Sequence, residues 1–212
     1  VDYLNDSNIR NNLFFSTSYQ KSINENTDIV FVCVQTPTDP DTGKTKTDYI
    51  SSVLTELKKI ERFNFIVCIK STIKATLVEK ISNEIDLDYK KIIFNPEFLR
   101  EGSAFYDFFN PDRIVIGGSD QKGLNQCTEL YESFDCEKII TDSNSSQMIK
   151  YLSNTYLAMR LSFVNETYRL VSEFNGNPEE VLNAIGKDKR IGNDYFRPCL
   201  LYTSPSPRDK SS

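Results

Sequence analysis

The chain has 212 residues, and 25 lysine and arginine residues against 30 aspartate and glutamate residues give it a formal net charge of −5. This mildly acidic balance, without a basic stripe, argues against nucleic-acid binding, and no apolar run approaches the ~18 residues of a membrane span. Five cysteines without CxxC spacing indicate a reducing compartment, the cytoplasm, rather than a disulfide scaffold or a zinc site.

The first two thirds of the chain alternate between apolar runs and amphipathic segments. Strands are predicted at residues 28–34, 65–69, 91–94, 113–118 and 138–140, and the first two read as strands buried on both faces. Residues 19–25 predict one or two helical turns, and longer helices are predicted at residues 47–60, 77–85 and 123–134. This alternation predicts βαβ units and an α/β fold, with a Rossmann-like parallel sheet covered by helices on both faces.

A different pattern begins near Asn144. Asn144 to Gln147 resemble a capping box, and apolar residues at helical spacing then predict one long helix to about Phe174. The stripe consists of Ile149, Leu152, Leu157, Leu161, Val164, Tyr168 and Val171. Asn175–Pro178 end this helix and open another through Ile185. We therefore expect an α/β domain over residues 1–141 and the start of an all-α domain over residues 142–198, with the long helix as a link or a subunit interface.

The last residues differ in character from the rest. Cys199–Asp209 can be back-translated, codon for codon, into a transposase-type sequencing adapter. We therefore expect residues 199–212 to be an artefact outside the fold. The alternative is a disordered C-terminus rich in serine and proline.

Polar side chains follow three of the predicted strands directly. They are Thr36 and Thr38, Ser71 and Thr72, and Glu97 and Glu101. Because ligands of such sheets bind beyond the carboxyl ends of the strands, these groups are expected to share one rim. As ordinary caps they would need no ligand. The two glutamates would share one face of a helix that begins after Pro96, where they could equally complement its dipole.

Three further polar residues lie in the helical part. Lys150 and Asn154 are four residues apart on the long helix, so both point to one side. A desolvated lysine can stabilise an oxyanion or move a proton, which matters in a chain with no histidine. The alternative is a solvated pair on the helix surface. Arg190 could bind a phosphate or carboxylate, or be an ordinary surface arginine.

Taken together, these segments resemble the UDP-glucose/GDP-mannose dehydrogenase family. The resemblance rests on Asn95–Gly102 with Pro111–Gly117, and on Lys150–Arg160 with Asn165 and Glu166. Supporting pieces are Val34–Thr38, Lys70–Thr72 and Asp188–Gly192. They occur in family order across about residues 12 to 198, and among members the chain looks most like those that oxidise UDP-glucose.

The resemblance implies an NAD-dependent oxidation of the C6 alcohol of a nucleotide sugar to a carboxylate, in two hydride transfers with a cysteine thioester between them. Lys150 would be the acid/base and oxyanion partner, and Asn154 its hydrogen-bonding neighbour. Glu97 would orient or deprotonate the hydrolytic water, with Thr72 nearby. Glu101 would lie between substrate and nicotinamide.

The resemblance also implies binding residues. The NAD pocket would be lined by Val34, Gln35, Thr36, Pro37, Thr38, Ser71 and Glu101. The substrate, UDP-glucose or a related nucleotide sugar, would meet Glu97, Phe98, Leu99, Arg100, Glu101, Lys150 and Asn154. Arg190 would reach the sugar nucleotide of a neighbouring subunit in a homodimer, or larger oligomer, built on the long helix. No metal is implied, and neither is a nucleic acid or a membrane.

Several features depart from the family pattern. The Gly-rich dinucleotide loop, GxGxxG, would lie before Val1, and the Gly-rich segment with the nucleophilic cysteine would lie after Pro198. We therefore expect an inactive fragment, cut at both ends. Lys74–Thr76 replace Pro-Val-Gly, and Gln147 stands where glutamate is usual. The alternatives are a substrate such as GDP-mannose or a UDP-N-acetylhexosamine, or a non-catalytic binding or assembly module of the same fold.

Overall fold

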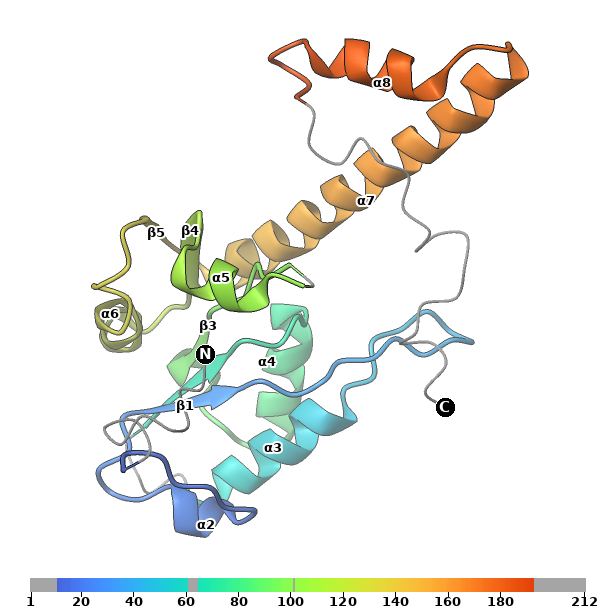
Figure 1. Ribbon diagram of the computed structural model, residues 1–212. Helices are drawn as coiled ribbons and strands as arrows, with labels where there is room; N and C mark the ends of the chain where they lie inside the picture. The colour runs from blue at the N-terminus through green and yellow to red at the C-terminus, as the bar shows by residue number, and fades with distance from the viewer. Residues whose placement is uncertain (1–10, 61–64, 101, 193–212) are drawn as a thin grey trace. The chain divides into compact units, whose positions relative to one another are not determined.

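The computed structural model describes residues 11–60, 65–100 and 102–192 (Figure 1). The chain forms two compact units, residues 1–150 and 151–212, which are considered separately. The predictions for Glu101, for residues 193–198 and for the adapter-like tail at 199–212 lie outside the described residues.

The first unit is built on a five-stranded sheet, with the strands in sequence order. The strands are β1 (Ile29–Val32), β2 (Ile66–Ile69), β3 (Ile92–Phe94), β4 (Arg113–Gly117) and β5 (Glu137–Thr141). The helices are α2 (Tyr19–Ser22), α3 (Asp48–Lys58), α4 (Ala75–Glu84), the 3₁₀ turn η2 (Tyr89–Lys91), α5 (Ala104–Phe109) and α6 (Gln121–Glu129). The five predicted strands and the four helices predicted between residues 19 and 134 are present, with shifted ends, whereas α5 and η2 are additions and the helix expected after Pro96 is absent.

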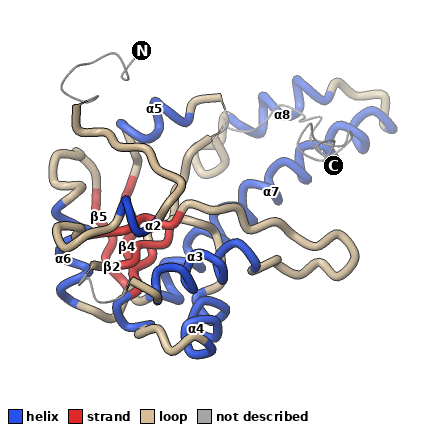
Figure 2. The backbone as a smooth tube through the Cα atoms, turned by 90° about the horizontal axis from the view of Figure 1, so that it is seen from below, coloured by secondary structure: helices blue, strands red, loops and turns tan. Residues whose placement is uncertain are grey.

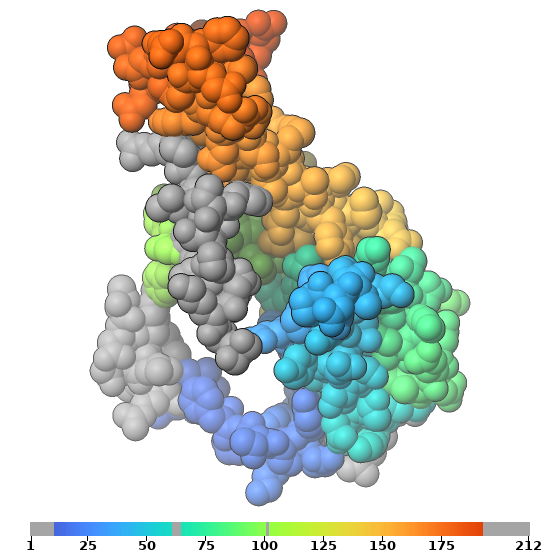
Figure 3. Space-filling model, turned by 90° about the vertical axis from the view of Figure 1, so that its right-hand side faces the viewer, coloured from blue at the N-terminus to red at the C-terminus, as the bar shows by residue number. Residues whose placement is uncertain are grey.

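Helices cover both faces of the sheet, as predicted (Figure 2). Side chains alternate along β2, so Val67 and Ile69 point into a core with α3 and α4, whereas Ile66 and Cys68 point into a second core with α6. In the space-filling view α3 and α4 lie side by side at the surface (Figure 3). The expectation that β1 is buried on both faces is wrong, because Phe31 is 39% exposed and β1 stands at the end of the strand order.

The sheet is mixed rather than wholly parallel, which corrects the prediction at one strand. β1, β2 and β3 run parallel, as do β4 and β5, but β4 pairs with β3 in the antiparallel sense through Phe94 and Gly117. β4 therefore starts from the carboxyl end of β3, after a connection that contains the six-residue helix α5.

A long helix, α7 (Ser143–Glu173), begins in the first unit and continues into the second. Asp142 caps it, because its carboxylate accepts from the Ser145 amide at 2.9 Å and its carbonyl from Ser146. The predicted capping box is therefore wrong, and Gln147 is buried instead. The expected apolar stripe is correct at Val164, which is fully buried, but wrong at Leu152, which is 58% exposed.

The second unit contains the rest of α7 and one shorter helix, α8 (Pro178–Gly186), which Asn177 caps. Asn175 takes a left-handed conformation, with φ of 55°, at the end of α7. The segment after α8 returns to the middle of α7, where Arg160 donates to the Ile191 carbonyl at 3.3 Å. None of the helices in the described residues is long and apolar enough to cross a lipid bilayer.

Candidate active site

The first unit brings Glu97 and Lys150 together, as the sequence predicted. Lys150 Nζ lies 3.4 Å from Glu97 Oε1, and the lysine side chain is only 6% exposed whereas that of Glu97 is 37% exposed. The expected helix after Pro96 is absent, because residues 95–100 form an irregular segment. Glu97 supports this segment itself, since its Oε2 accepts from the Leu99 amide at 2.6 Å. Both carboxylate oxygens are therefore held.

Lys150 reaches this position because the first turns of α7 are buried in the first unit. Lys150 lies four residues after Ser146 and three after Gln147, and all three are buried. Gln147 Oε1 accepts from the Ile73 amide at 3.4 Å, which ties α7 to the segment after β2. Its Nε2 is buried and has no hydrogen-bond partner among the described residues. Sequence reasoning assigned Gln147 to a cap and missed this contact.

The segments that follow β1 and β2 are joined by their hydroxyl groups. Thr36 Oγ1 donates to the Thr72 carbonyl at 2.9 Å, and Ser71 Oγ donates to the Val34 carbonyl at 2.6 Å. The polar side chains of Gln35 and Thr38, like Pro37, are exposed beside them. The hydroxyl groups of Thr36 and Ser71 therefore cap neighbouring backbone carbonyls, while the exposed polar atoms of Gln35 and Thr38 remain at the rim.

A second polar cluster lies beside the ion pair and escaped sequence reasoning. Lys70 Nζ donates to Asn95 Oδ1 at 2.9 Å, and the Tyr131 hydroxyl donates to the same oxygen at 2.5 Å. Asn95 Nδ2 donates to the Val115 carbonyl of β4 at 2.8 Å. Burial lowers the pKa of Lys70 and raises that of Tyr131. Lys70 and Asn95 follow β2 and β3 directly, so the strand-end rule could have found them.

The other predicted residues are placed as follows. Leu99 is 39% exposed, and Arg100 is paired with Asp107 through its backbone amide, at 2.8 Å, and its guanidinium. Hydrogen bonds from Arg100 hold the pKa of Asp107 well below its usual range. In the second unit, Asn154 is exposed on α7, and Arg190 pairs with Asp188 at 2.6 Å with its side chain 88% exposed.

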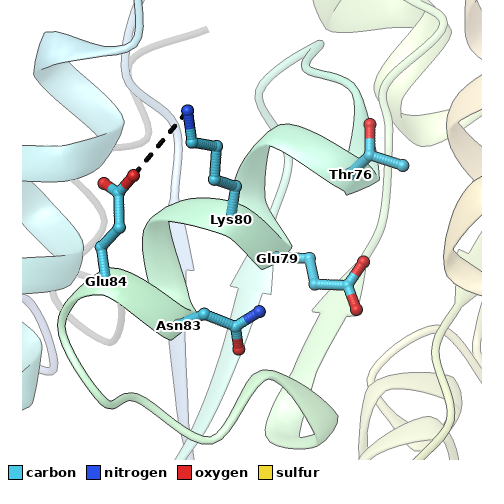
Figure 4. A pocket seen from close by; sticks show the side chains of 5 residues that line it. All are labelled: Thr76, Glu79, Lys80, Asn83 and Glu84. Atoms are coloured by element: carbon cyan, nitrogen blue, oxygen red, sulfur yellow. Dashed lines mark ion pairs between the residues drawn. The ribbon is translucent and has the colours of Figure 1, made fainter.

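A shallow hollow on the outer face of α4 is separate from these groups. Thr76, Glu79, Lys80, Asn83 and Glu84 line it (Figure 4). Lys80 and Glu84 form an exposed ion pair across it at 3.9 Å. It contains none of the predicted site residues, so the rim that carries Glu97 and Lys150 is the candidate active site.

At this rim of an α/β sheet a buried ammonium lies beside a partly exposed carboxylate. Residues 2–135 match the NAD-binding domain of the UDP-glucose/GDP-mannose dehydrogenase family, and residues 144–205 match the central domain of that family. The chain belongs to this family, whose cofactor is NAD.

Individual relatives agree with the family match. The chain is 35% identical over 209 residues to UDP-glucose 6-dehydrogenase YwqF of Bacillus subtilis, covering 94% of this chain and 46% of the relative. A UDP-glucose dehydrogenase structure from Pyrobaculum islandicum superposes with a TM-score of 0.74 at 35% identity, over 82% of this chain and 42% of that one. A GDP-mannose dehydrogenase structure from Pseudomonas aeruginosa gives 0.76 at 27% identity, over 86% and 44%. The chain thus spans less than half of each of these proteins.

Proposed function

We propose that the chain supplies part of the active site of an NAD-dependent UDP-glucose 6-dehydrogenase, which oxidises UDP-glucose to UDP-glucuronate. The observation that carries this proposal is the buried Lys150 ammonium, 3.4 Å from the Glu97 carboxylate, at the carboxyl rim of a sheet that matches an NAD-binding domain. The identity to relatives of that name supports the choice of substrate.

The residues present fit the cofactor. Thr36 and Ser71 fix the backbone after β1 and β2, and Gln35 and Thr38 offer exposed donors and acceptors of the kind that bind ribose and phosphate. NAD, when bound, accepts the hydride. We assign its pocket to Val34, Gln35, Thr36, Pro37, Thr38, Ser71 and Glu101.

The charges of the ion pair suit two proton transfers. As the cation, a desolvated lysine stabilises an alkoxide or oxyanion where it forms, and as the neutral amine it would take the proton of the C6 hydroxyl and so become that cation. The partly exposed Glu97 carboxylate is accessible to water, which it can orient for hydrolysis, with Thr72 nearby. Phe98, Leu99 and Arg100 would present their backbone to the sugar nucleotide. Asn154 would be a hydrogen-bonding neighbour of Lys150, and Arg190 would reach the sugar nucleotide of a neighbouring subunit.

A thioester step needs a cysteine nucleophile in a Gly-rich segment, which this sequence does not contain. We therefore propose that turnover requires a chain that includes that segment, and that residues 1–212 alone do not turn over. Purified chain with UDP-glucose and NAD should produce no NADH. Production of NADH would refute this part of the proposal while leaving the assignment of substrate intact.

Ligand binding tests the site directly. Saturation-transfer NMR on the chain should detect UDP-glucose in the presence of NAD, and Lys150→Met should weaken the signal. The matched control is Lys80→Met in the hollow on α4, which should leave it unchanged. If UDP-glucose shows no transfer in the native chain, or if both variants lose it equally, the proposed site is wrong.

GDP-mannose is a second candidate substrate, because a GDP-mannose dehydrogenase has a similar fold. A UDP-N-acetylhexosamine is a third. Competition among UDP-glucose, GDP-mannose and a UDP-N-acetylhexosamine ranks them, and displacement of UDP-glucose by either of the others would overturn the substrate assignment. Binding of NAD without any nucleotide sugar would favour a non-catalytic module.

The four described cysteines are free thiols, which supports a cytoplasmic location for the enzyme.

We also propose that the second unit forms a homodimer through α7. Four exposed apolar side chains, Leu152, Tyr156, Met159 and Phe163, are 55–58% exposed and follow one another at steps of four, three and four residues. That spacing is the seam of a two-helix coiled coil, and an apolar stripe of this length favours a second copy of the same helix.

Sedimentation velocity tests the dimer. Phe163→Glu places a charge in the seam and should convert a dimer to a monomer. Asn183→Glu, at an exposed position on α8, introduces the same charge away from the seam and should leave the dimer intact. A native chain that sediments as a monomer at all concentrations would refute the proposal.

A further inference from the structure

The ring of Phe98 lies against two cations at the candidate site. Lys150 Nζ is 5.2 Å from the ring centroid, and the guanidinium carbon of Arg113 is 4.2 Å from it. Both distances are within the ~6 Å at which a cation is attracted to the face of an aromatic ring. Phe98 therefore connects β4 to α7 through its ring, in addition to its place in the backbone beside Glu97.

The antiparallel pairing of β3 and β4 explains why Arg113 is there. Phe94 is opposite Gly117 in the antiparallel pairing of β3 with β4, so the segment after Phe94 and the start of β4 lie at the same end of the two strands. Phe98 lies in that segment, and Arg113 is the first residue of β4. The reversal of β4 thus places its first guanidinium at the end of the sheet where Phe98 lies.

Among the residues that the structure describes, Glu97 and the ring of Phe98 are the groups that compensate the charge of Lys150. Lys150 is 5% exposed, and an ammonium has three N–H donors to satisfy. Its contact with Glu97 Oε1, at 3.4 Å, is longer than the usual range for an N–H···O hydrogen bond. A single long ion pair fixes the distance of the ammonium poorly, and the ring supplies a second attraction from another direction.

We propose that Phe98 is a positioning residue for Lys150, holding the ammonium beside Glu97 by a cation–π contact, with Arg113 fixing the ring on β4. The catalytic importance of this contact rests on the proposed function, in which Lys150 is the acid/base group. The contact itself concerns only residues of the first unit and requires no substrate. An apolar side chain of similar volume would fill the space but would not attract the cation.

The variants Phe98→Leu and Phe98→Tyr separate attraction from packing. The measurement is the rate at which a small amine-reactive acylating agent modifies Lys150, determined by peptide mass spectrometry. The rate is normalised to that of Lys80, whose side chain is 74% exposed. Phe98→Leu should raise the Lys150 rate about fivefold, the change expected from losing one cation–π contact. Phe98→Tyr retains the ring and should stay within about twofold of the native rate.

Lys70 reports on the fold in the same experiment, because it is held by Asn95 and partly buried. A rise at Lys150 with Lys70 unchanged supports the proposal. Equal rates at Lys150 in the native chain and Phe98→Leu, or equal rises in both variants, would overturn it. If Lys70 also becomes reactive in Phe98→Leu, the substitution has disturbed the fold. The NMR measurement on the native chain then tests the proposal.

In the native chain the ring current of Phe98 is the spectroscopic signature. With ¹³C-labelled lysine, the ε-methylene protons of Lys150 should resonate upfield of those of the other lysines, and Phe98→Tyr should preserve the displacement. Lys150→Arg assigns the signal by removing it. A Lys150 signal at the position of exposed lysines would overturn the proposal. If the native chain shows the upfield signal but does not bind UDP-glucose, the proposed function is refuted while the contact between Phe98 and Lys150 is supported.

Discussion

The ion pair between Lys150 and Glu97 predicts unequal effects when either partner is removed. At 3.4 Å the Coulomb attraction of two unit charges is about 1 kcal/mol in water and about 5 kcal/mol at an effective dielectric constant of 20. The carboxylate is 37% exposed, so water screens part of this attraction. We expect a coupling free energy of about 2 kcal/mol, toward the lower half of that range.

Glu97→Gln leaves the buried ammonium without its counter-charge and should lower the free energy of unfolding by about 2 kcal/mol. Lys150→Met fills the buried space with an apolar chain, and the carboxylate left behind can be hydrated. That variant should cost less than about 1 kcal/mol. The ordering of the two variants follows from which of the two partners is buried.

Urea denaturation of the native chain, both single variants and the double variant gives the coupling free energy from a thermodynamic cycle. The exposed pair Lys80 and Glu84, at 3.9 Å with side chains 74% and 61% exposed, is the matched control. The same cycle there should give about 0.3 kcal/mol or less. A coupling at Lys150 no larger than in the control, or a greater cost for Lys150→Met than for Glu97→Gln, would refute the reasoning.

Three further predictions concern the packing around the site. Gly117→Ala should cost more than about 2 kcal/mol of unfolding free energy, since its Cβ would lie 2.6 Å from the Asp142 carbonyl; a stable variant with an unchanged urea midpoint would contradict this contact. Tyr131→Phe should cost about 1 kcal/mol in the same assay, because it removes the hydroxyl that donates to Asn95, and no cost would mean that Lys70 alone satisfies the amide. Arg100 lowers the folded-state pKa of Asp107, so this carboxylate contributes stability above its usual pKa of 3.8 and loses it as the pH falls toward the lower folded value. In acid denaturation monitored by circular dichroism, Asp107→Asn should therefore lose less stability below pH 3.8 than the native chain does. Equal losses of stability in the two proteins would refute this role of Asp107.

The sequence predicted the elements well because their signals are local. Apolar runs and helical periodicity located the five strands and the helices α2, α3, α4 and α6 of the first unit, and the rule for strand ends placed Glu97 at the rim of the sheet. The direction of β4 could not be read in this way, because apolar strands look alike in either direction. It is seen in the pairing of Phe94 with Gly117, which are 23 residues apart in the sequence.

The details of the site depended on contacts distant in sequence. Gln147 has the spacing of a cap, and only the fold shows that its amide meets Ile73. Phe98 reads as an ordinary apolar residue, since its two cations come from segments 15 and 52 residues away in the sequence. Glu97 was expected on a helix, but its own carboxylate stabilises a non-helical segment by accepting from Leu99.

The reversal of β4 makes the length of the chain between Phe94 and Arg113 a constraint in its own right. Because five pairs with β5 hold β4 in register, a residue inserted ahead of β4 would be absorbed in the irregular connection and would displace Phe98 relative to Arg113. Deletions would have the same effect. We therefore expect orthologous sequences to preserve the number of residues in this segment even where their identities drift, while segments such as 39–46 vary freely in length.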